Sequence, residues 1–390
     1  MNAESKLLIG ALRRAVVGKR EHLCLDADWQ ETLKLAAAHM LLPLLYDGLR
    51  RVPEDWAQVP ENTQKVLQQC FMRAVYKDTQ FEHLRLKLVQ ELIKAGVPHV
   101  FLKGAVLKED YPVPALRTMC DMDVLVHTED YAAIHDVAVS LGGKPGHSDG
   151  NHRNFLFPGG VAVEFHPNLL HHGTPVGTQI NPGWQYVKED TGVSLKMTEE
   201  GMYLNTICHL ANHFVSGGVG IRFVLDVWVN RHLRNPQPDR AFVEAELMRF
   251  GLLEFAQNIE ALAEVWFGDG DPAALPEGLE EYILTSGSHG LADRAILNAV
   301  ALSPDGSRGS ALLKKAFYSR AELEDRFPWC KGKAWLLPAA WCARAFGAVT
   351  RHGKLILKWS KGTGEVSREQ VHEQRQMMRR FGIDPEKKKK

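Results

Sequence analysis

The sequence predicts an α+β protein, in which a small mixed sheet with its own helices lies between two mostly helical regions. Apolar residues recur every three or four positions over residues 5–95 and again beyond residue 181, which is the period of helices with one buried face. Between these regions, from Val97 to His166, the apolar runs are short or alternate with polar residues, as strands do.

The N-terminal region is expected to be helical throughout residues 5–95, and its clearest pattern covers residues 61–95. Gly96 follows this pattern at a position where helices often end on a left-handed glycine. The apolar positions of the pattern are Leu67, Phe71, Val75, Phe81, Leu84, Leu88 and Leu92.

Two strands with a short helix between them are predicted next. Residues 97–102 form an apolar run of strand length, and after Lys103-Gly104 residues 105–111 suit a helix, which the prolines 112 and 114 end. Residues 119–127 alternate in character. Their even-numbered side chains are apolar and therefore form the buried side of the second strand.

A second helix and a hairpin complete the sheet region. Residues 128–143 suit a helix with Thr128 as N-cap and a glycine pair at its end. Residues 153–157 and 161–166 alternate in character on both sides of Pro158-Gly159-Gly160, which predicts an antiparallel hairpin.

Four parts are expected along the chain. Residues 1–95 are a helical N-terminal segment, residues 96–180 the sheet module, residues 181–350 a helical C-terminal domain, and residues 351–390 a basic, partly disordered tail. Helical patterns in the third part cover residues 199–214, 221–233 and 241–267, with shorter pieces to about Thr350.

The charges are distributed unevenly, although 47 basic and 47 acidic residues cancel in the whole chain. From Arg308 to the C-terminus there are 20 basic and 8 acidic residues, a net charge of +12, which leaves −12 for residues 1–307. The C-terminal region therefore offers a surface for an anionic partner.

Tryptophans alternate with the basic residues of this region. The arrangement suits a nucleic-acid backbone with stacked bases, or equally a membrane surface. Alternatively, the tryptophans are core residues of a helix that starts near Pro338, and the charges are its solvated face. The residues concerned are Trp329, Trp335, Trp341 and Trp359 with Lys331, Lys333, Arg344, Arg351, Lys354 and Lys358, and Lys387–Lys390 are read as a disordered end.

The cysteines and the N-terminal residues indicate the cellular compartment of the chain. The six cysteines are dispersed without a C-x-x-C pair, which excludes a zinc knuckle or redox motif and favours the reducing cytoplasm. Glu4 and Lys6 stand where a secretory signal needs apolar residues, and no run approaches the roughly 18 apolar residues of a membrane span. A soluble cytoplasmic chain without a transmembrane segment is expected, with a surface-bound helix as an alternative.

Three carboxylates indicate a metal site. Asp121 and Asp123 lie two apart on a predicted strand, so both point to the same side of the sheet. Two carboxylates this close repel each other unless a cation lies between them, and a divalent metal would fit. Glu164 stands between two apolar residues of the last strand. If that strand pairs with the Asp121 strand, the three carboxylates form a ligand set for Mg²⁺ that holds a triphosphate.

Residues next to these carboxylates suit phosphate binding. Lys103-Gly104 provides a cation, close backbone approach and a helix N-terminus, and Arg117 is a candidate for a second phosphate contact. His166 points to the same side of its strand as Glu164. It is placed to reach an acceptor or a phosphate, or else to pack the sheet edge.

Taken together, LKGAVLKEDY, LRTMCDMDVLV and VAVEFHPNL resemble the uncharacterised nucleotidyltransferase family of the DNA polymerase β-type superfamily, with its LKG, R-x-x-x-D-x-D and V-E-x-H motifs. YLNTICHLANHF, LDVWVN and RFPWCKGKAWLLPAAWCAR resemble that family's C-terminal half, so the resemblance covers most of residues 25–350.

The resemblance implies a polymerase-β-like core and transfer of a nucleoside monophosphate from a nucleoside triphosphate to an acceptor hydroxyl, with loss of pyrophosphate. Asp121, Asp123 and Glu164 would hold Mg²⁺, or Mn²⁺ as an alternative, and Glu164 would help deprotonate the acceptor. Lys103, Gly104, Arg117 and His166 would bind the nucleotide. Where the superfamily usually has Gly-Gly or Gly-Ser, this chain has Lys103-Gly104-Ala105, and Lys103 would replace the lost donor. The acceptor, whether RNA, protein or small molecule, stays open.

Two other functions remain as alternatives. One is a catalytically silent nucleotide- or RNA-binding regulator of the same fold, of an antitoxin-like kind. The other is a metal-dependent hydrolase that uses His209 and His213, which lie one turn apart on a predicted helix. His171 and His172 are read as a solvated turn. Asp226 is expected either to form a buried ion pair with an arginine, such as Arg222 one turn back, or to act in catalysis.

Overall fold

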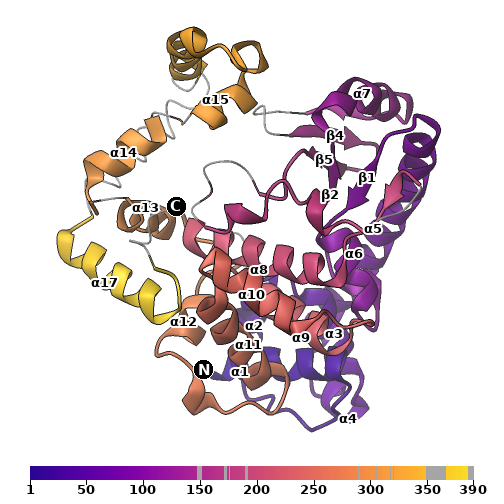
Figure 1. Ribbon diagram of the computed structural model, residues 1–390. Helices are drawn as coiled ribbons and strands as arrows, with labels where there is room; N and C mark the ends of the chain where they lie inside the picture. Colours follow the sequence, from indigo (N-terminus) through magenta and orange to yellow (C-terminus); the bar gives the residue numbers. More distant parts are fainter. Residues whose placement is uncertain are drawn as a thin grey trace.

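The computed structural model has an α+β architecture with a six-stranded mixed sheet, as the sequence predicts (Figure 1). The structure describes residues 1–146, 152–170, 174, 176–188, 192–288, 290–303, 305–316, 318, 320–347 and 366–384. His171, His172, Trp359, Arg351, Lys354, Lys358 and Lys387–Lys390 lie outside these residues.

The described sheet has the strand order β3-β4-β5-β2-β1-β6. β2 is central, antiparallel to β1 and parallel to β5, and β4 and β5 form the predicted hairpin. β3 and β6 were not predicted, because two residues are too few to produce a periodic pattern. The strands are β1 (His99–Phe101), β2 (Asp121–Val126), β3 (Lys144–Pro145), β4 (Arg153–Phe157), β5 (Val161–His166) and β6 (Ser194–Leu195).

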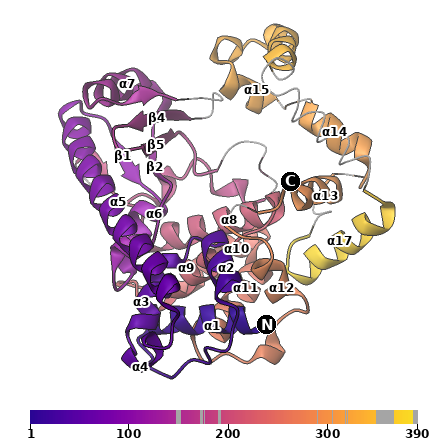
Figure 2. The same ribbon diagram turned by 180° about the vertical axis from the view of Figure 1, so that it is seen from behind.

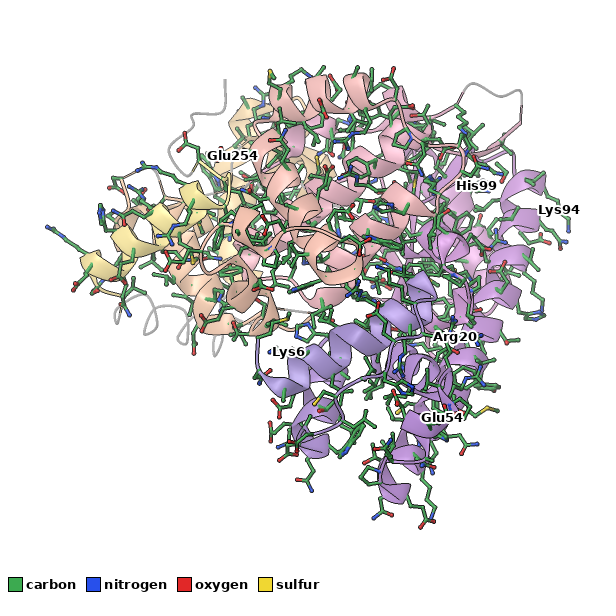
Figure 3. All side chains as sticks on the ribbon, turned by 90° about the horizontal axis from the view of Figure 1, so that it is seen from below. Lys6, Arg20, Glu54, Lys94, His99 and Glu254 are labelled. Carbon is green, nitrogen blue, oxygen red and sulfur yellow. The ribbon has the colours of Figure 1, made fainter. Side chains whose placement is uncertain are left out.

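The N-terminal region contains five α-helices among its described residues, α1 (Ala3–Leu12), α2 (Trp29–Ala38), α3 (Leu42–Arg50), α4 (Pro53–Trp56) and α5 (Glu61–Lys94). The expectation of unbroken helix over residues 5–95 is wrong at residues 18–28, where the chain leaves the helix at Gly18 with φ +84°. The end of α5 is confirmed, since Gly96 has φ +69°. Lys94 lies at the surface and His99 inside (Figure 3).

The helices of the sheet region are α6 (Gly104–Leu107) and α7 (Tyr131–Ser140). α7 is preceded by a 3₁₀ turn over Thr128–Asp130. The hydroxyl of Thr128 donates to the carboxylate of Glu129, so the prediction that Thr128 caps the helix is wrong. The Thr128 hydroxyl thus bonds the neighbouring Glu129 side chain and not a backbone N–H of α7.

Each face of the sheet packs against a different set of helices (Figures 1 and 2). α5 and α7 cover the face that carries the even-numbered side chains of β2, as expected. On the other face, Val100 and Leu125 join a larger core that contains both the N-terminal helices and the C-terminal ones. The odd-numbered carboxylates of β2 therefore face the C-terminal helices.

The C-terminal region is helical, as predicted, with one break that the pattern did not show. Residues 241–267 form two helices because Gly251 has φ +73°. The helices are α8 (Glu199–Ser216), α9 (Ile221–His232), α10 (Arg240–Phe250), α11 (Leu253–Phe267), α12 (Leu279–Leu284), α13 (Ala292–Ala301), α14 (Arg308–Ala316), α15 (Arg320–Arg326) and α17 (Arg368–Arg380).

The tryptophans of the basic region differ in environment. Trp329 and Trp335 are 45% and 76% exposed, so the interpretation of these two as core residues is wrong. Trp341 packs against a small cluster around Leu323, and its Nε1 donates to the carbonyl oxygen of Tyr318 at 3.2 Å. Within the described part of the chain, no helix has the length and apolar character needed to cross a bilayer.

His39 ties three helices together and gives the stability of the chain a defined pH dependence. Its Nε2 donates to the carbonyl oxygen of Leu284, and its Nδ1 accepts the backbone N–H of Ile221, each at 3.0 Å. Burial lowers the pKa of His39 to about 4, from 6.5. The neutral ring is therefore favoured in the folded state.

Between pH 6.5 and 4 the unfolded chain binds more protons at this residue than the folded one, so stability falls as the pH falls. The contribution of His39 is present above pH 6.5 and amounts to about 3 kcal/mol. We expect His39→Gln to flatten the pH dependence of the unfolding free energy in urea titrations between pH 7 and pH 4. The exposed His83→Gln should retain the wild-type dependence, and an equal flattening in both variants would contradict this assignment.

Candidate active site

The pairing of β2 with β5 brings the predicted carboxylates together. Asp123 lies directly opposite Glu164, and Leu125 lies opposite His166. Asp121 is opposite Ala162 on the same face of the sheet. The condition set by the sequence, that these two strands are neighbours, is confirmed.

Asp123 is the most constrained carboxylate of the site. It is 7% exposed, and its Oδ1 accepts from Lys103 Nζ at 3.0 Å and from His166 Nε2 at 2.8 Å. Burial alone would raise the pKa of Asp123, but the Lys103 ammonium and His166 together hold it far below its ordinary range. Asp123 is therefore ionised.

Glu164 and His166 extend this network. The Oε2 of Glu164 lies 3.4 Å from His166 Nε2, and its Oε1 accepts from Asn154 Nδ2 at 3.2 Å. The hydrogen bond from His166 lowers the pKa of Glu164 against the opposing effect of burial. Burial would lower the pKa of His166, but its bonds to both carboxylates raise it. His166 thus lies between the two acids.

Asp121 has a different environment from its neighbours. Burial and then the negative charge of Asp123 raise the pKa of Asp121. It lies outside the tightest cluster, in which ligand atoms of Asp123, Glu164 and His166 are all within 4.8 Å of one another.

The residues fit a divalent cation. Asp123 and Glu164 face each other at the centre of the sheet, where His166 contacts both carboxylates and the Lys103 ammonium contacts Asp123. Oxygen ligands suit Mg²⁺, and the imidazole makes the set suitable for Mn²⁺ as well.

The Lys103-Gly104 segment differs from a simple phosphate loop. Lys103 has φ +48° and ψ −123°, a backbone conformation that costs a non-glycine residue about 1–3 kcal/mol. A Cβ on Gly104 would lie 2.4 Å from Nη1 of Arg117 and 2.8 Å from Sδ of Met119. The space beside Gly104, where a phosphate was expected to approach the backbone, is thus filled by the side chains of Arg117 and Met119. α6, which begins at Gly104, is a single turn.

Asp226 forms a buried ion pair with an arginine, as expected, but its partner is Arg117. Nε and Nη2 of Arg117 donate to the two carboxylate oxygens at 3.0 and 2.7 Å, and the hydroxyl of Tyr111 donates to Oδ1 at 2.7 Å. The expected pairing of Asp226 with Arg222 is wrong. Arg222 Nη1 donates instead to the carbonyl oxygen of Thr118 at 2.6 Å.

His209 and His213 lie together on α8, with their Nε2 atoms 3.0 Å apart. Among the described residues, no third His, Cys, Asp or Glu completes a metal cluster with them. Burial, followed by the charges of Lys103 and His213, keeps the pKa of His209 well below its usual value. The metal-dependent hydrolase alternative therefore has no support among the described residues.

Two contacts of Glu164 were missed by sequence reasoning. Asn154 is paired with Glu164 in the hairpin, and the predicted turn at residues 158–160 already determines that register. His152 Nε2 lies 3.9 Å from Glu164 Oε1, and its ring stacks on that of His166. No pattern indicated His152, because it precedes the strand.

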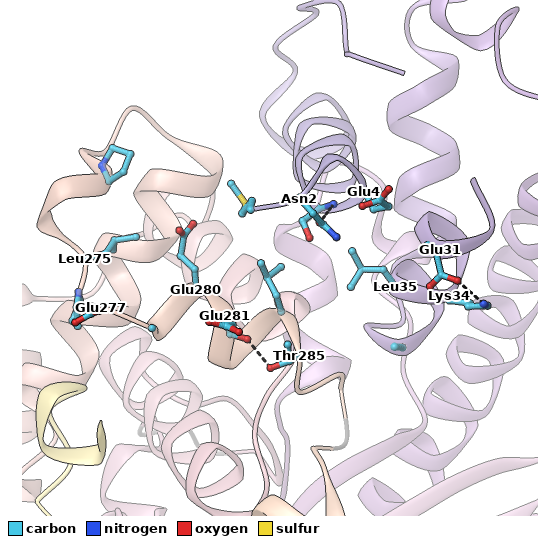
Figure 4. Close-up of a pocket in the computed structure, with 17 residues that line it drawn as sticks. Asn2, Glu4, Glu31, Lys34, Leu35, Leu275, Glu277, Glu280, Glu281 and Thr285 are labelled. Atoms are coloured by element: carbon cyan, nitrogen blue, oxygen red, sulfur yellow. Dashed lines mark hydrogen bonds and ion pairs between the residues drawn. The ribbon is translucent and has the colours of Figure 1, made fainter. Parts of the chain in front are cut away.

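A pocket of about 830 Å³ lies at the other end of the molecule, between α1, α2 and α12 (Figure 4). It is lined by five glutamates and one lysine, and none of the site residues contributes to it.

Comparison with known proteins finds one family match. The model of the uncharacterised nucleotidyltransferase family matches residues 26–268, well over half of the chain. This range contains the whole described sheet and the helices from α2 to α11. No curated protein and no solved structure matches the chain significantly.

Proposed function

Because the chain belongs to the uncharacterised nucleotidyltransferase family, we propose that it transfers a nucleoside monophosphate from a nucleoside triphosphate to an acceptor hydroxyl. The observation that carries this proposal is the register that places Asp123 opposite Glu164, with Asp121 on the same face. We further propose a polymerase-β-like core within residues 96–180, and the other boundaries expected from the sequence stay predictions.

Asp121, Asp123 and Glu164 are proposed to hold Mg²⁺ or Mn²⁺, and the close cluster adds His166 to this set. Such an ion, when bound, neutralises phosphate charge and orients the triphosphate. In this proposal, the ammonium group of Lys103 breaks its hydrogen bond to Asp123 and binds a phosphate of the nucleotide instead. The flexible side chain of Lys103 is 21% exposed, which supports such a movement.

Glu164 is proposed to act on the acceptor. Its pKa is lowered, so the carboxylate is ionised and able to take the proton of the acceptor hydroxyl. The acceptor oxygen then forms a bond to the α-phosphorus, the bond from this phosphorus to the bridging oxygen breaks, and pyrophosphate leaves. Gly104 is buried against the side chain of Arg117. We propose that its lack of a side chain lets the Lys103-Gly104 segment and the Arg117 segment lie close together.

A nucleic acid is the acceptor class to test first. The segment 308–347 has eight basic and three acidic residues, and it exposes Trp329 and Trp335. Cations next to exposed aromatic rings bind single-stranded nucleic acids through their phosphates and stacked bases. Protein hydroxyls and small molecules are the other acceptor classes.

The experiment uses each α-labelled nucleoside triphosphate with Mg²⁺ or Mn²⁺ and, in turn, total RNA, cell protein and small metabolites. We expect label to move to one acceptor class, with one pyrophosphate released per transfer. Asp121→Ala combined with Asp123→Ala should abolish both signals. Transfer that survives in this double variant would remove the assignment.

The silent regulator remains a second candidate, favoured by one observation. Lys103, in place of a glycine, forms an ion pair with Asp123 across the proposed metal site. A silent chain would bind nucleoside triphosphate or RNA in calorimetric titrations but release no pyrophosphate with any acceptor.

A further inference from the structure

Arg222 is a cation without an acidic partner in the first turn of α9. Its Nη1 donates to the carbonyl oxygen of Thr118, and its Nε is buried without a hydrogen-bond partner. Within the described part of the chain, no carboxylate lies within 4 Å of its guanidinium, whose side-on donors Nε and Nη2 are both uncommitted. Arg117 binds Asp226 through these same two atoms.

The electrostatic environment makes this placement costly. Asp226, the carboxylate whose charge acts on Arg222, is already bound by Arg117 and Tyr111. Arg222 also lies at the positive end of α9, where a cation is unfavourable. Burial, and then the charge of Arg117, lower the pKa of Arg222. A bound anion would offset this uncompensated charge.

Arg222 contacts the segment that leads into β2, the strand that carries Asp121 and Asp123 of the proposed active site. Its contact Thr118 is three residues before Asp121, and the neighbouring Arg117 lies against Gly104. The ring of the next residue, Phe223, contacts the rings of His209 and His213 on α8 at centroid distances of 6.0 and 5.6 Å. The guanidinium carbon of Arg222 lies 5.5 Å from the centre of the Phe223 ring, so Arg222 is close both to the start of β2 and to the histidines of α8.

We propose that Arg222 binds the β- and γ-phosphates of the nucleoside triphosphate through its Nε and Nη2. The side-on fork of a guanidinium matches two phosphate oxygens, and a lysine at this position would give only a point charge. This inference rests on the proposed function, because it assigns the terminal phosphates of the same substrate to a residue of the C-terminal domain.

Inorganic tripolyphosphate is the probe, titrated calorimetrically into the full chain in the presence of Mg²⁺. We expect the wild type to bind it, Arg222→Gln to bind it about 10- to 100-fold more weakly, and Arg222→Lys to fall between them. Arg231→Gln is the matched control on the same helix. Arg231 pairs with Glu260, and in this variant Glu260 still pairs with Arg240. The affinity of Arg231→Gln should equal that of the wild type.

Thermal unfolding separates this role from a structural one. Without ligand, Arg222→Gln should unfold at the wild-type temperature or above it, because it removes a charge that has no counter-ion. With tripolyphosphate, it should lose the upward shift that the wild type shows. The proposal would be overturned if the wild type did not bind tripolyphosphate, or if Arg222→Gln bound it with wild-type affinity. It would also be overturned if Arg222→Gln were less stable than the wild type without ligand and Arg222→Lys restored both the stability and the full affinity.

Failure of the proposed function gives a different result. A chain that binds tripolyphosphate through Arg222 but transfers no label contradicts only the transfer reaction. A chain that transfers label, with an unchanged KM for nucleoside triphosphate in Arg222→Gln, contradicts only the role of Arg222.

Discussion

Asp123→Asn is expected to lower the rate of nucleotidyl transfer by about 10³-fold or more, equivalent to ~4 kcal/mol in the activation barrier. The amide removes the ionised oxygen that Lys103 and His166 both contact, at the centre of the proposed metal site. Binding of Mn²⁺, measured by titration, should weaken in parallel. The measurement is the initial rate of labelled product with the best acceptor and nucleotide.

The matched control for this variant is Asp136→Asn. Asp136 is exposed on α7, which covers the opposite face of the sheet, and it undergoes the same chemical change. Its rate should equal that of the wild type. If Asp123→Asn keeps more than a tenth of the wild-type rate, Asp123 is not a metal ligand of this reaction.

Asp226→Asn should give the largest loss of stability, about 3–5 kcal/mol in the free energy of unfolding. Asp226 is 2% exposed and accepts three hydrogen bonds from Arg117 and Tyr111. The amide would leave the buried guanidinium of Arg117 without a carboxylate partner. Urea titrations at neutral pH measure the difference.

Two further variants check the cause of this loss. Asp269→Asn removes an exposed carboxylate that pairs with Lys19, and it should leave the unfolding free energy unchanged. Adding Arg117→Met to Asp226→Asn should restore part of the stability, because the unpaired buried cation is removed. A loss below about 1 kcal/mol in Asp226→Asn would show that the pair contributes little.

Much of the site could be predicted because it depends on local periodicity. Alternation along β2 and β5 decides which side chains share a face, and the turn at residues 158–160 sets the hairpin register. α5 could be predicted because its apolar face continues over many turns. Only the pairing of β2 with β5 had to be assumed.

The remaining contacts depend on the fold as a whole. Arg117 and Asp226 are 109 positions apart, so no local spacing indicates their pairing, whereas Arg222 stood one turn away and was chosen wrongly. Arg117 therefore had to be found from the structure, whereas the break at residues 18–28 has local signals that were overlooked, a left-handed Gly18 and the N-cap Asp28. For Asp226, tertiary contacts decided among partners that the local sequence allows.

The shared core of the N- and C-terminal helices has a consequence for synthesis on the ribosome. Leu8 and Leu12 of α1 pack in the same cluster as Phe255 and Ile259 of α11, and Arg13 Nη2 donates to the carbonyl oxygen of Gly268 at 3.0 Å. In a nascent chain, α2 and α3 can cover part of the apolar face of α1 early, but the part that packs against α11 stays uncovered until about 250 further residues have been added. Such distant contacts slow folding and lengthen the time in which chaperones can bind.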